Sequence, residues 1–432
     1  MYLIRELRYY CSSLLFLGGD ILGVMKDSGI EWIGEIPEHW AFSRISSLYG
    51  LRSEKVSDRD YPPLSVTKSG ILPQLETVAK TDAHDDRKLV KRGDFVINSR
   101  SDRRGSCGIS EYDGSVSLIN TVLYPIAGMN PRYYNWFFHM NEFADEFYKW
   151  GHGIVDDLWT TRWQDMKNIV IIAPPVDEQE IIANFLDEKC TNIDSLISEL
   201  KKQTEILEEY KCAVITETVT KGLDSNAEMK NSGVQWIEKI PKHWNTHPIY
   251  CYFSERKNKN YSGLENNLLS LSYGKIVRRN INSNDGLLPE SFNTYNIIEK
   301  DDIIIRPTDL QNDKRSLRTA IAKEHGIITS AYIALKATKT INSKYFHYLL
   351  YSYDIMKVFY NMGNGVRQGL NFSEFSNLIV FEPTIEEQNE IVSYLEEKCT
   401  EIDSIISEKK QQIKIIEEYK KSLIFEYVTG KK

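Results

Sequence analysis

Two segments of the chain carry apolar residues at alternating spacings of four and three positions, the pattern of a helix that buries one narrow stripe. The first stripe consists of Ile182, Leu186, Ile193, Leu196, Leu200, Leu207, Tyr210 and Val214. The second consists of Ile391, Leu395, Ile402, Ile405, Ile416, Tyr419 and Leu423. The spacing predicts two helices of about 45 residues, each roughly 65 Å long. Because each stripe needs a partner, we expect the two helices to pair antiparallel as a coiled-coil spacer.

Prolines and glycines indicate where these helices begin and end. Pro174-Pro175 and Pro383 precede them, where a missing backbone N–H costs nothing. Gly222 and Gly430 stand where helices usually stop. Polar residues at seam positions fix the register of such a pair. Those on the two stripes are Lys189, Gln203, Lys398, Lys409 and Gln412.

An internal repeat covers most of the chain. Residues 27–40, DSGIEWIGEIPEHW, recur as residues 231–244, NSGVQWIEKIPKHW. Glu178-Gln179 recurs in the same way as Glu387-Gln388. The middle parts of the two copies, 41–173 and 245–382, differ much more. Two copies of one frame are therefore expected to carry different surfaces.

The middle parts favour a mixed α/β structure, because short β-branched runs alternate with helical stretches. Aromatic residues at helical spacing over 133–150 and 344–360 are expected to form cores rather than stacking surfaces. The predicted fold is α/β: two mixed α/β domains in tandem, separated by two long antiparallel helices that form a coiled-coil spacer, with a pseudo-twofold internal repeat. The predicted boundaries are an N-terminal extension at 1–24, domains at 25–173 and 225–382, and long helices at 174–224 and 383–432.

Charge is distributed unevenly along the chain. The net charge is −8, yet residues 177–221 contain 11 acidic and five basic residues, and residues 386–432 contain 11 and eight. The predicted helices thus carry the whole acidic excess, and the remainder is near neutral with local basic clusters. One cluster at 87–104 contains Arg87, Lys88, Lys91, Arg92, Arg100, Arg103 and Arg104. The overall charge therefore does not argue against a nucleic-acid partner.

The cysteines and the N-terminus indicate the compartment. The six cysteines include no CxxC pair and no zinc-like spacing with histidine, as expected of a reduced cytoplasmic protein. The apolar run at 14–17 is too short to span a membrane, because Gly18-Gly19-Asp20 interrupts it. Residues 1–24 are interpreted as an extension upstream of a more natural start at Met25, because the repeat begins at Asp27.

A search for catalytic motifs finds none. The chain has no GxxxxGK[ST] phosphate loop, and Gly151-His-Gly153 and Gly363-Asn-Gly365 are isolated pairs. Asp187-Glu-Lys189 and Glu396-Glu-Lys398 resemble part of a nuclease motif, but both lie on the predicted helices, where a solvated face explains them better. We expect no catalytic residue, no metal site and no cofactor in this chain.

Aromatic and histidine residues of the repeated motif belong to the shared frame, which favours packing or a subunit contact over catalysis. They are Trp32, His39, Trp40, Trp236, His243 and Trp244. Residues of the two apolar helix stripes are likewise expected to pair the helices or to dock subunits. These are Ile182, Leu186, Ile193, Leu200, Leu207, Ile391, Leu395, Ile402 and Ile416.

A resemblance to a known family is carried by the repeated 27–40 motif, by the Pro-Pro-x-x-Glu-Gln179 motif at the start of the first helix, and by the helix segments IDSLI at 193–197 and VTKG at 219–222. With these motifs the chain resembles type I restriction-modification specificity subunits over nearly its whole length. The resemblance implies two target-recognition domains that each read one half of a bipartite asymmetric site in double-stranded DNA. It implies docking of two methyltransferase subunits and of restriction subunits with nuclease and translocase activity. S-adenosylmethionine, Mg²⁺ and ATP would be used by those partners. No membrane partner is implied.

Basic and amide side chains in the diverged middle parts are the candidates for DNA contact, since Arg and Lys pair with guanine or phosphate and Asn and Gln with adenine. In the first domain they are Lys68, Arg100, Arg103, Arg104 and, as a hydroxyl, Ser106. In the second domain they are Lys275, Arg278, Arg279, Arg306, Gln311, Asn312, Lys314, Arg315, Arg367 and Gln368.

Three alternatives stay open at this point. The chain could be the recognition subunit of a methylation-only system without nuclease partners. It could be a coiled-coil adaptor that does not bind DNA. It could also be a nuclease whose site the motifs do not reveal, in which case the purified protein would cut DNA with Mg²⁺ alone.

Overall fold

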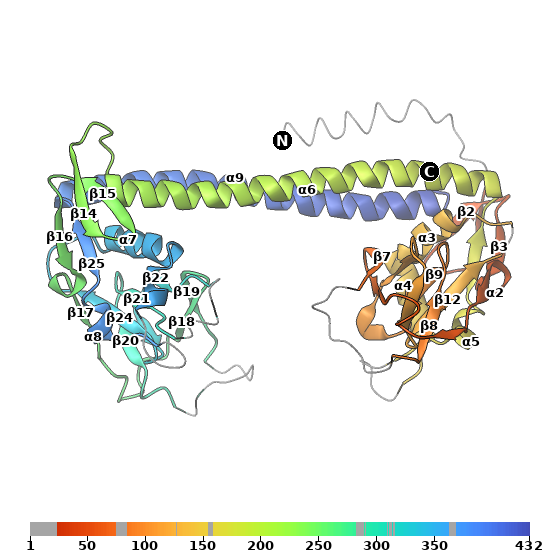
Figure 1. Ribbon diagram of the computed structural model, residues 1–432, viewed down its shortest axis with the longest axis horizontal. Coiled ribbons are helices and arrows are strands. Elements are labelled where there is room, and N and C mark those ends of the chain that lie inside the picture. Colours follow the sequence, from red (N-terminus) through yellow and green to blue (C-terminus); the bar gives the residue numbers. More distant parts are fainter. Residues whose placement is uncertain are drawn as a thin grey trace. The chain divides into compact units, whose positions relative to one another are not determined.

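The chain forms two compact units, which we describe separately. A computed structural model describes residues 24–74, 84–126, 128–153, 159–281, 289, 291–308, 310, 313, 316–362 and 369–432. Unit 1 comprises Met1–Glu199 and Gln412–Lys432, and unit 2 comprises Leu200–Gln411. The two long helices, α6 (Val176–Lys221) and α9 (Ile385–Val428), each contribute to both units (Figure 1). The fold is thus mixed α/β with two long helices, as predicted. The N-terminal extension lies outside the described residues up to position 23.

Unit 1 contains antiparallel sheets and short helices. A four-stranded sheet has the order β10-β9-β12-β4, a three-stranded sheet has the order β11-β8-β5, and β1–β2, β3–β13 and β6–β7 form pairs. The strands are β1 (Met25–Asp27), β2 (Glu35–Pro37), β3 (Ala41–Arg44), β4 (Tyr49–Leu51), β5 (Lys55–Val56), β6 (Leu64–Thr67), β7 (Gly70–Pro73), β8 (Arg87–Val90), β9 (Phe95–Asn98), β10 (Cys107–Ile109), β11 (Gly114–Ser117), β12 (Asn120–Pro125) and β13 (Val170–Ala173). The helices besides the long pair are α2 (Ile45–Leu48), η1 (Ser101–Arg103), α3 (Pro131–His139), α4 (Asn141–Lys149) and α5 (Trp163–Met166).

Unit 2 repeats this plan. A four-stranded sheet has the order β17-β24-β21-β22, and β14–β15, β16–β25, β18–β19 and β20–β23 form pairs. The strands are β14 (Met229–Val234), β15 (Ile237–Pro241), β16 (Asn245–Pro248), β17 (Phe253–Glu255), β18 (Leu269–Ser272), β19 (Lys275–Arg278), β20 (Asn296–Ile298), β21 (Ile303–Ile305), β22 (Thr319–Ile321), β23 (Gly326–Ile328), β24 (Ile333–Ala337) and β25 (Ile379–Glu382). The helices are η3 (Ile249–Cys251), α7 (Ser343–Ile355), η4 (Val358–Asn361) and α8 (Phe372–Phe375).

Aromatic residues of the short helices form the two main cores. Tyr134, Phe137 and Phe138 of α3 are at most 1% exposed in unit 1, and Tyr345 and Phe346 of α7 are fully buried in unit 2. Asparagines at both N-caps accept a hydrogen bond from the backbone N–H two residues later, which satisfies one free donor of each helix. The expectation that these aromatic stretches form cores is confirmed for these residues.

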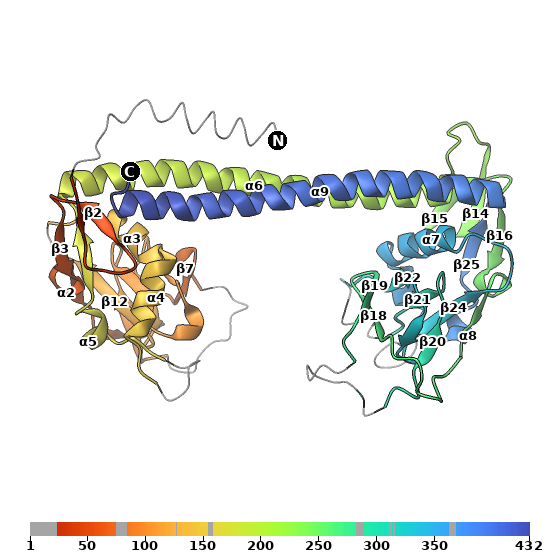
Figure 2. The same cartoon turned by 180° about the vertical axis from the view of Figure 1, so that it is seen from behind.

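Within each unit the beginning of one long helix packs antiparallel beside the end of the other (Figure 2). In unit 1, Lys420 of α9 donates to the carboxylate of Asp194 of α6 at 2.6 Å. In unit 2, Lys211 of α6 donates to Asp403 of α9 at 2.6 Å. These two contacts are copies of each other under the internal repeat, so both units use the same pairing register.

The buried seam differs from the predicted stripe by one position in places. The predicted seam residues Leu196, Tyr210, Ile405 and Tyr419 are 42%, 55%, 39% and 46% exposed. Ile197 and Ile406, the immediate neighbours of Leu196 and Ile405, are buried instead. The prediction failed there because two apolar residues stand side by side at 196–197 and 405–406, and spacing alone does not select one. Elsewhere Ile182, Leu186, Leu200, Ile391, Leu395, Ile402 and Ile416 are buried, and Ile193 and Leu207 are half-buried.

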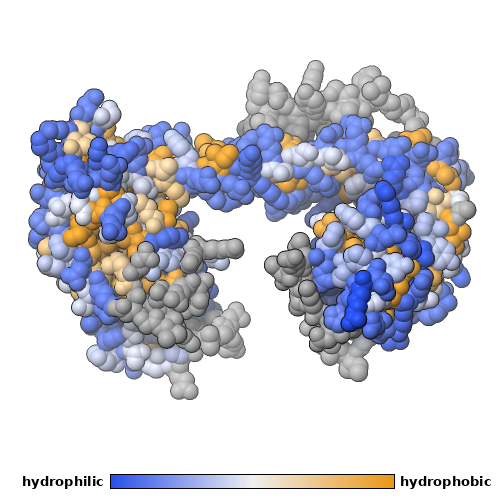
Figure 3. Space-filling view, in the orientation of Figure 1, coloured by the Kyte–Doolittle hydropathy of each residue, from blue (hydrophilic) through white to orange (hydrophobic). Residues whose placement is uncertain are grey.

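Exposed apolar side chains occur on the long helices. Unit 2 exposes Ile206, Tyr210 and Ile405, and unit 1 exposes the repeat-related Ile415, Tyr419 and Leu196. We call these the two helix triads. In the space-filling view, separate apolar groups interrupt a mostly hydrophilic helix surface (Figure 3). Each unit therefore carries its own copy of the same apolar set.

Candidate nucleic-acid interface

The repeated Glu-Gln pair at the start of each long helix binds that helix to the repeated Trp motif and to the N-cap of a short helix in the same unit. In unit 1 the Trp40 indole N–H donates to Glu178 Oε2 at 2.8 Å, and His39 Nε2 lies 2.7 Å from Glu178 Oε1. The backbone N–H of Asn130, the N-cap of α3, donates to Gln179 Oε1 at 2.8 Å. The same contacts occur in unit 2.

The unit 2 copies have closely similar lengths. The Trp244 indole N–H donates to Glu387 at 2.9 Å, and the backbone N–H of Asn342 donates to Gln388 Oε1 at 2.9 Å. Trp40 and Trp244 are 2% and 0% exposed, and Trp32 and Trp236 pack half-buried against their cores. Two roles were predicted for these tryptophans, packing within the domain or contact with another subunit, and their positions favour packing. Trp40 and Trp244 offer almost no surface to another subunit.

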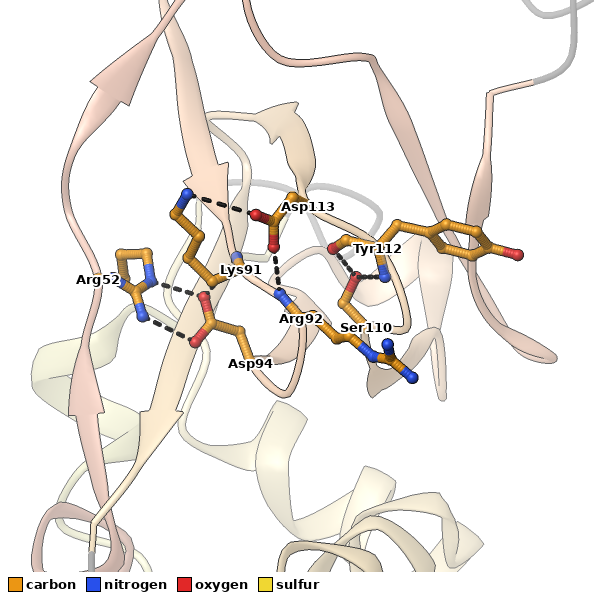
Figure 4. Close-up of polar contacts among 7 residues, drawn as sticks. All are labelled: Arg52, Lys91, Arg92, Asp94, Ser110, Tyr112 and Asp113. Atoms are coloured by element: carbon orange, nitrogen blue, oxygen red, sulfur yellow. Dashed lines mark hydrogen bonds and ion pairs between the residues drawn. The ribbon is translucent and has the colours of Figure 1, made fainter.

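A second repeated contact fixes the central sheets. In unit 1 the guanidinium of Arg52 donates to both carboxylate oxygens of Asp94, at 2.6 and 2.9 Å, and the backbone N–H of Lys91 donates to the same carboxylate (Figure 4). This bond with Asp94 raises the pKa of Arg52. Asp94 is 2% exposed, so the ion pair is buried on one side.

Unit 2 contains the corresponding pair Arg256 and Asp302, joined at 3.0 Å. The backbone N–H of Glu299 donates to Asp302 as that of Lys91 does to Asp94. Burial raises the pKa of Asp302, although Arg256 opposes that shift. These two Arg–Asp pairs, which we call clasps, lie in the diverged middle parts. The aspartates stand in similar runs, GDFVI at 93–97 and DDIII at 301–305, whereas the residues around the two arginines match less closely.

The basic cluster at 87–104 is only partly available to a ligand. Arg87 is 6% exposed and donates to the hydroxyl and backbone oxygens of Ser115. Lys88 donates to the backbone oxygen of Asn120 at 2.6 Å, and burial lowers its pKa. Asp113 binds Lys91 and the backbone N–H of Arg92 (Figure 4). Arg87 and Lys88 are therefore used inside the fold, whereas the side chains of Lys91 and Arg92 reach solvent and pair with surface carboxylates.

The first-domain candidates lie on two loops. Lys68 is exposed at the tip of hairpin β6–β7. Arg100 and Arg103 contact Asp102 at 2.9 and 3.8 Å around η1, and Arg104 pairs with Asp145. The structure brings these three arginines together but neutralises them with neighbouring carboxylates.

Ser106 is a correction to the candidate set. It is 6% exposed, and its backbone N–H donates to Arg103 while its carbonyl accepts from Asn98. Ser106 closes the loop that bears the arginines and cannot present its hydroxyl to a ligand in this conformation.

The second-domain candidates are more scattered. Lys275 is exposed at the tip of hairpin β18–β19, and Arg279 is exposed just after it. Arg278 binds Glu324 with three donor contacts, and Arg306 lies 3.5 Å from Asp313. The remaining candidates lie outside the described residues: Gln311, Asn312, Lys314, Arg315, Arg367 and Gln368.

Neutralised arginines can still bind phosphate. An exposed ion pair contributes only about 0–1 kcal/mol, so exchanging its carboxylate for a phosphate costs little. Arg103 and Arg278 are 69% and 73% exposed at the side chain, which leaves donors free to reach a ligand. Arg87 and Ser106 lack that freedom because they are buried.

A buried polar cluster in unit 2 also escaped the sequence reasoning. Arg318 is fully buried and donates to the backbone oxygen of Asp313 at 2.6 Å, and its backbone N–H donates to the buried carboxylate of Asp354. Burial raises the pKa of Asp354 to about 6 and lowers the pKa of nearby His347 to about 4. These groups bind one another and the backbone, which is a structural role.

Searches for other kinds of site among the described residues are negative. No group of three or more His, Cys, Asp or Glu side chains is placed to hold a metal ion in that part of the chain. None of its helices is long and apolar enough to cross a membrane. The five cysteines described there are free thiols.

We compared the chain with known protein families, curated proteins and solved structures. No family model matches the chain. A protein named putative type I restriction enzyme MjaX specificity subunit, from Methanocaldococcus jannaschii, is 23% identical over 431 residues, which cover 92% of this chain and 95% of that protein. The chain is thus similar, over nearly the full length of both proteins, to a protein named as a type I restriction enzyme specificity subunit.

Two further similarities agree with this family. The type I restriction enzyme MjaVIII specificity subunit of the same organism is 26% identical over 61% of this chain and 62% of that protein. One solved structure, described as the basis of complex assembly and conformational transition of the type I R-M system, contains a chain with a TM-score of 0.67 and 12% identity. It covers 91% of this chain and 99% of that one, and shows a shared fold.

Proposed function

We propose that this chain is the sequence-specific DNA-binding subunit of a type I restriction-modification complex. The observation that carries the proposal is the similarity to a specificity subunit along nearly the full length of both chains. Specificity subunits recognise DNA and carry no catalytic site, so this chain is a non-catalytic subunit of an enzyme complex.

Each domain would read one half of a bipartite site in double-stranded DNA. The two units share the Trp–Glu contact, the Asn–Gln contact and the Arg–Asp clasp, yet their exposed loops differ. Hairpin β6–β7 bears Lys68 at its tip, whereas the corresponding hairpin β18–β19 bears Tyr273. Different tips on one frame support an asymmetric site, because base edges are distinguished by the side chains that meet them.

The long helices would hold the two half-sites at a fixed gap. α6 has 46 residues and α9 has 44, and both run without interruption. A flexible linker would allow many separations, whereas paired helices allow one. Lys409 of α9 donates to Gln203 of α6 at 2.6 Å, a polar seam contact of the kind that fixes register.

The helix triads are our candidates for docking two methyltransferase subunits. Ile206 and Tyr210 are one turn apart on α6, and Ile405 lies at the same level of the helix pair in unit 2, because Asp403 and Lys410 of α9 contact Lys211 and Glu208 of α6. Unit 1 repeats the set with Ile415, Tyr419 and Leu196. Two equal apolar surfaces suit two copies of one partner, and an apolar surface left in solvent favours such a contact.

The partners would supply the chemistry. Methyltransferase subunits would use S-adenosylmethionine, and restriction subunits, where present, would use Mg²⁺ and ATP to translocate and cut. The assembly would act in the cytoplasm.

Selection from a randomised duplex library tests the proposal. The chain is assembled with its methyltransferase partner, and bound duplexes are recovered and sequenced. Two short enriched blocks with a constant unspecific gap support the proposal. Assembly without enrichment of any sequence would contradict it and favour the coiled-coil adaptor.

A further inference from the structure

The tip of hairpin β18–β19 holds a tyrosine in solvent in a strained conformation. Ser272 pairs with Lys275, so Tyr273 and Gly274 form the turn, with φ of 47° and 73°. Positive φ at both central residues suits the twist of a hairpin and favours Asn-Gly. A bulky residue is rare there because its Cβ crowds the backbone. Tyr273 is 83% exposed, so packing against the described residues does not compensate the strain.

The fold fixes the position of this side chain. A Cβ on residue 274 would lie 2.9 Å from Leu317 Cδ1, so the turn sits directly against Leu317. Leu269 and Leu271 of β18 are buried in a small cluster below the hairpin. The hairpin is therefore anchored along one face, and Tyr273 projects from a rigid support.

Available positive charge lies next to the ring. Lys275, Lys300 and Lys323 line the same surface cleft as Tyr273, and all three are exposed. They form no ion pair with any described residue, in contrast to Arg278. Three carboxylates also line this cleft: Asp301, and Glu396 and Asp403, which pair with Lys344 and Lys211. The charge of the lining therefore stays positive. A surface with unpaired lysines beside an exposed ring has the groups that bind DNA, because lysines bind phosphate and apolar side chains contact base edges.

The corresponding hairpin of unit 1 has similar strands but a different tip. Residues 64–67 and 71 are LSVT and Ile, and residues 269–272 and 276 are LSLS and Ile. Between them stand Lys68-Ser69-Gly70 in unit 1 and Tyr273-Gly274-Lys275 in unit 2. A marked change of side chain at an exposed tip is expected where two copies meet different base sequences.

We propose that Tyr273 is a specificity-determining residue of the second domain, with its ring in contact with base edges in the major groove of DNA. The proposal rests on the proposed DNA-recognition function. A two-stranded ribbon fits the major groove, where the thymine methyl group offers an apolar contact. Lys275 would bind an adjacent phosphate.

Two variants of the full chain, assembled with its methyltransferase, test this proposal. Tyr273→Asn removes the ring but keeps a turn that Asn-Gly favours, and Tyr273→Phe keeps the ring. The probe is a duplex bearing the site selected by the wild-type complex, compared with the same duplex altered in either half-site. We expect Tyr273→Asn to weaken binding about tenfold and to lose discrimination at the second-domain half-site only. Tyr273→Phe should stay within about twofold of wild type.

Lys68→Asn provides the matched control, because it changes the tip of the other hairpin. It should alter discrimination only at the first-domain half-site. The proposal is overturned if Tyr273→Asn keeps the affinity and base preference of the wild type. It is equally overturned if that variant loses the methyltransferase in size-exclusion chromatography, which would assign Tyr273 to a protein contact. Failure of the wild-type complex to prefer any duplex would refute the proposed function itself.

Discussion

The indole N–H of Trp40 donates to the carboxylate of Glu178 at 2.8 Å, so the first domain is fastened to the start of α6 by a nearly buried bond. The repeat reproduces it with Trp244 and Glu387. A residue pair that recurs in both copies therefore ties each domain to the long helix that follows it.

Loss of the Glu178 carboxylate should lower the stability of unit 1. Glu178→Ala leaves the indole N–H without its partner, and an unsatisfied buried donor costs about 1–3 kcal/mol of unfolding free energy. Glu178→Gln keeps an acceptor oxygen and should cost less. Denaturant unfolding of both variants measures the difference, and Glu387→Ala serves as the matched change in unit 2. Equal stability of Glu178→Ala and wild type would show that the bond does not contribute.

Glycine at the end of each long helix allows a close approach. Gly430 has φ of 71°, and a Cβ there would lie 2.5 Å from Pro37 Cδ and 2.7 Å from Trp40 Cη2. Gly430→Ala should therefore lower the unfolding free energy by about 1–3 kcal/mol. Gly222→Ala in unit 2, whose nearest contact would be 3.1 Å, should cost less. Thermal unfolding orders the two variants, and the reverse order would contradict this packing.

Two buried groups of unit 2 should give opposing pH dependences. The pKa of Asp354 is raised to about 6 from an unfolded value near 4, so its contribution to stability is present below about pH 4 and is lost as the pH rises through 6. The pKa of His347 is lowered to about 4, so its contribution is present above about pH 6.5 and is lost as the pH falls through 4.

These effects partly cancel in the wild type, and single variants separate them. Asp354→Asn should lose stability on acidification from about pH 6.5 to pH 4, because only the histidine effect remains. His347→Gln should gain stability over the same range. The test is the denaturant midpoint of each variant measured across this pH range. If the midpoints of both variants change with pH in the same direction, the assigned pKa shifts of Asp354 and His347 are wrong.

Arginines of the η1 loop should contribute to the salt dependence of DNA binding. Arg103→Ala with Arg104→Ala removes two potential phosphate contacts, each worth about 0.9 in the slope of log K against log salt concentration. The assembled complex should therefore lose up to about two units of slope. Lys202→Ala with Lys414→Ala, on exposed faces of the long helices, is the control and should leave the slope unchanged. An unchanged slope in the arginine variant would remove this loop from the interface.

Much of the fold could be predicted because its signals are periodic or repeated. The 4-3 spacing revealed both long helices, and the repeated motifs revealed the shared frame. Register within the seam was less certain, since Leu196 and Ile197 are both apolar and only packing selects Ile197. The runs GDFVI at 93–97 and DDIII at 301–305 align Asp94 with Asp302, but too few residues around Arg52 and Arg256 match to reveal the Arg–Asp clasp.

The candidate interface was harder to predict, because charge in a sequence says nothing about pairing. Arg87 and Arg103 look alike along the chain, yet one is buried on Ser115 and the other is exposed. Tyr273 was missed for another reason. Its signal is the Tyr-Gly dipeptide between two alternating runs, which marks a hairpin turn, while only basic, amide and hydroxyl side chains were considered for DNA contact.

The helix pair should act as a ruler. One heptad inserted after Glu199 in α6 and another after Gln411 in α9 would lengthen both helices by two turns, about 10.5 Å. This is about three base pairs of duplex at 3.4 Å each, so the gap between half-sites should grow by about three. Insertion in α6 alone should destabilise the pair, because Lys420 and Asp194 would lose their register. An unchanged gap in the double insertion would refute the ruler.

Methylome sequencing tests the central claim most directly. Cellular DNA is sequenced after expression of this chain with its methyltransferase, and modified sites are aligned. Recognition by two domains on a rigid helical pair predicts one motif made of two different short blocks with a constant gap. A single contiguous motif, or blocks at variable separation, would contradict it.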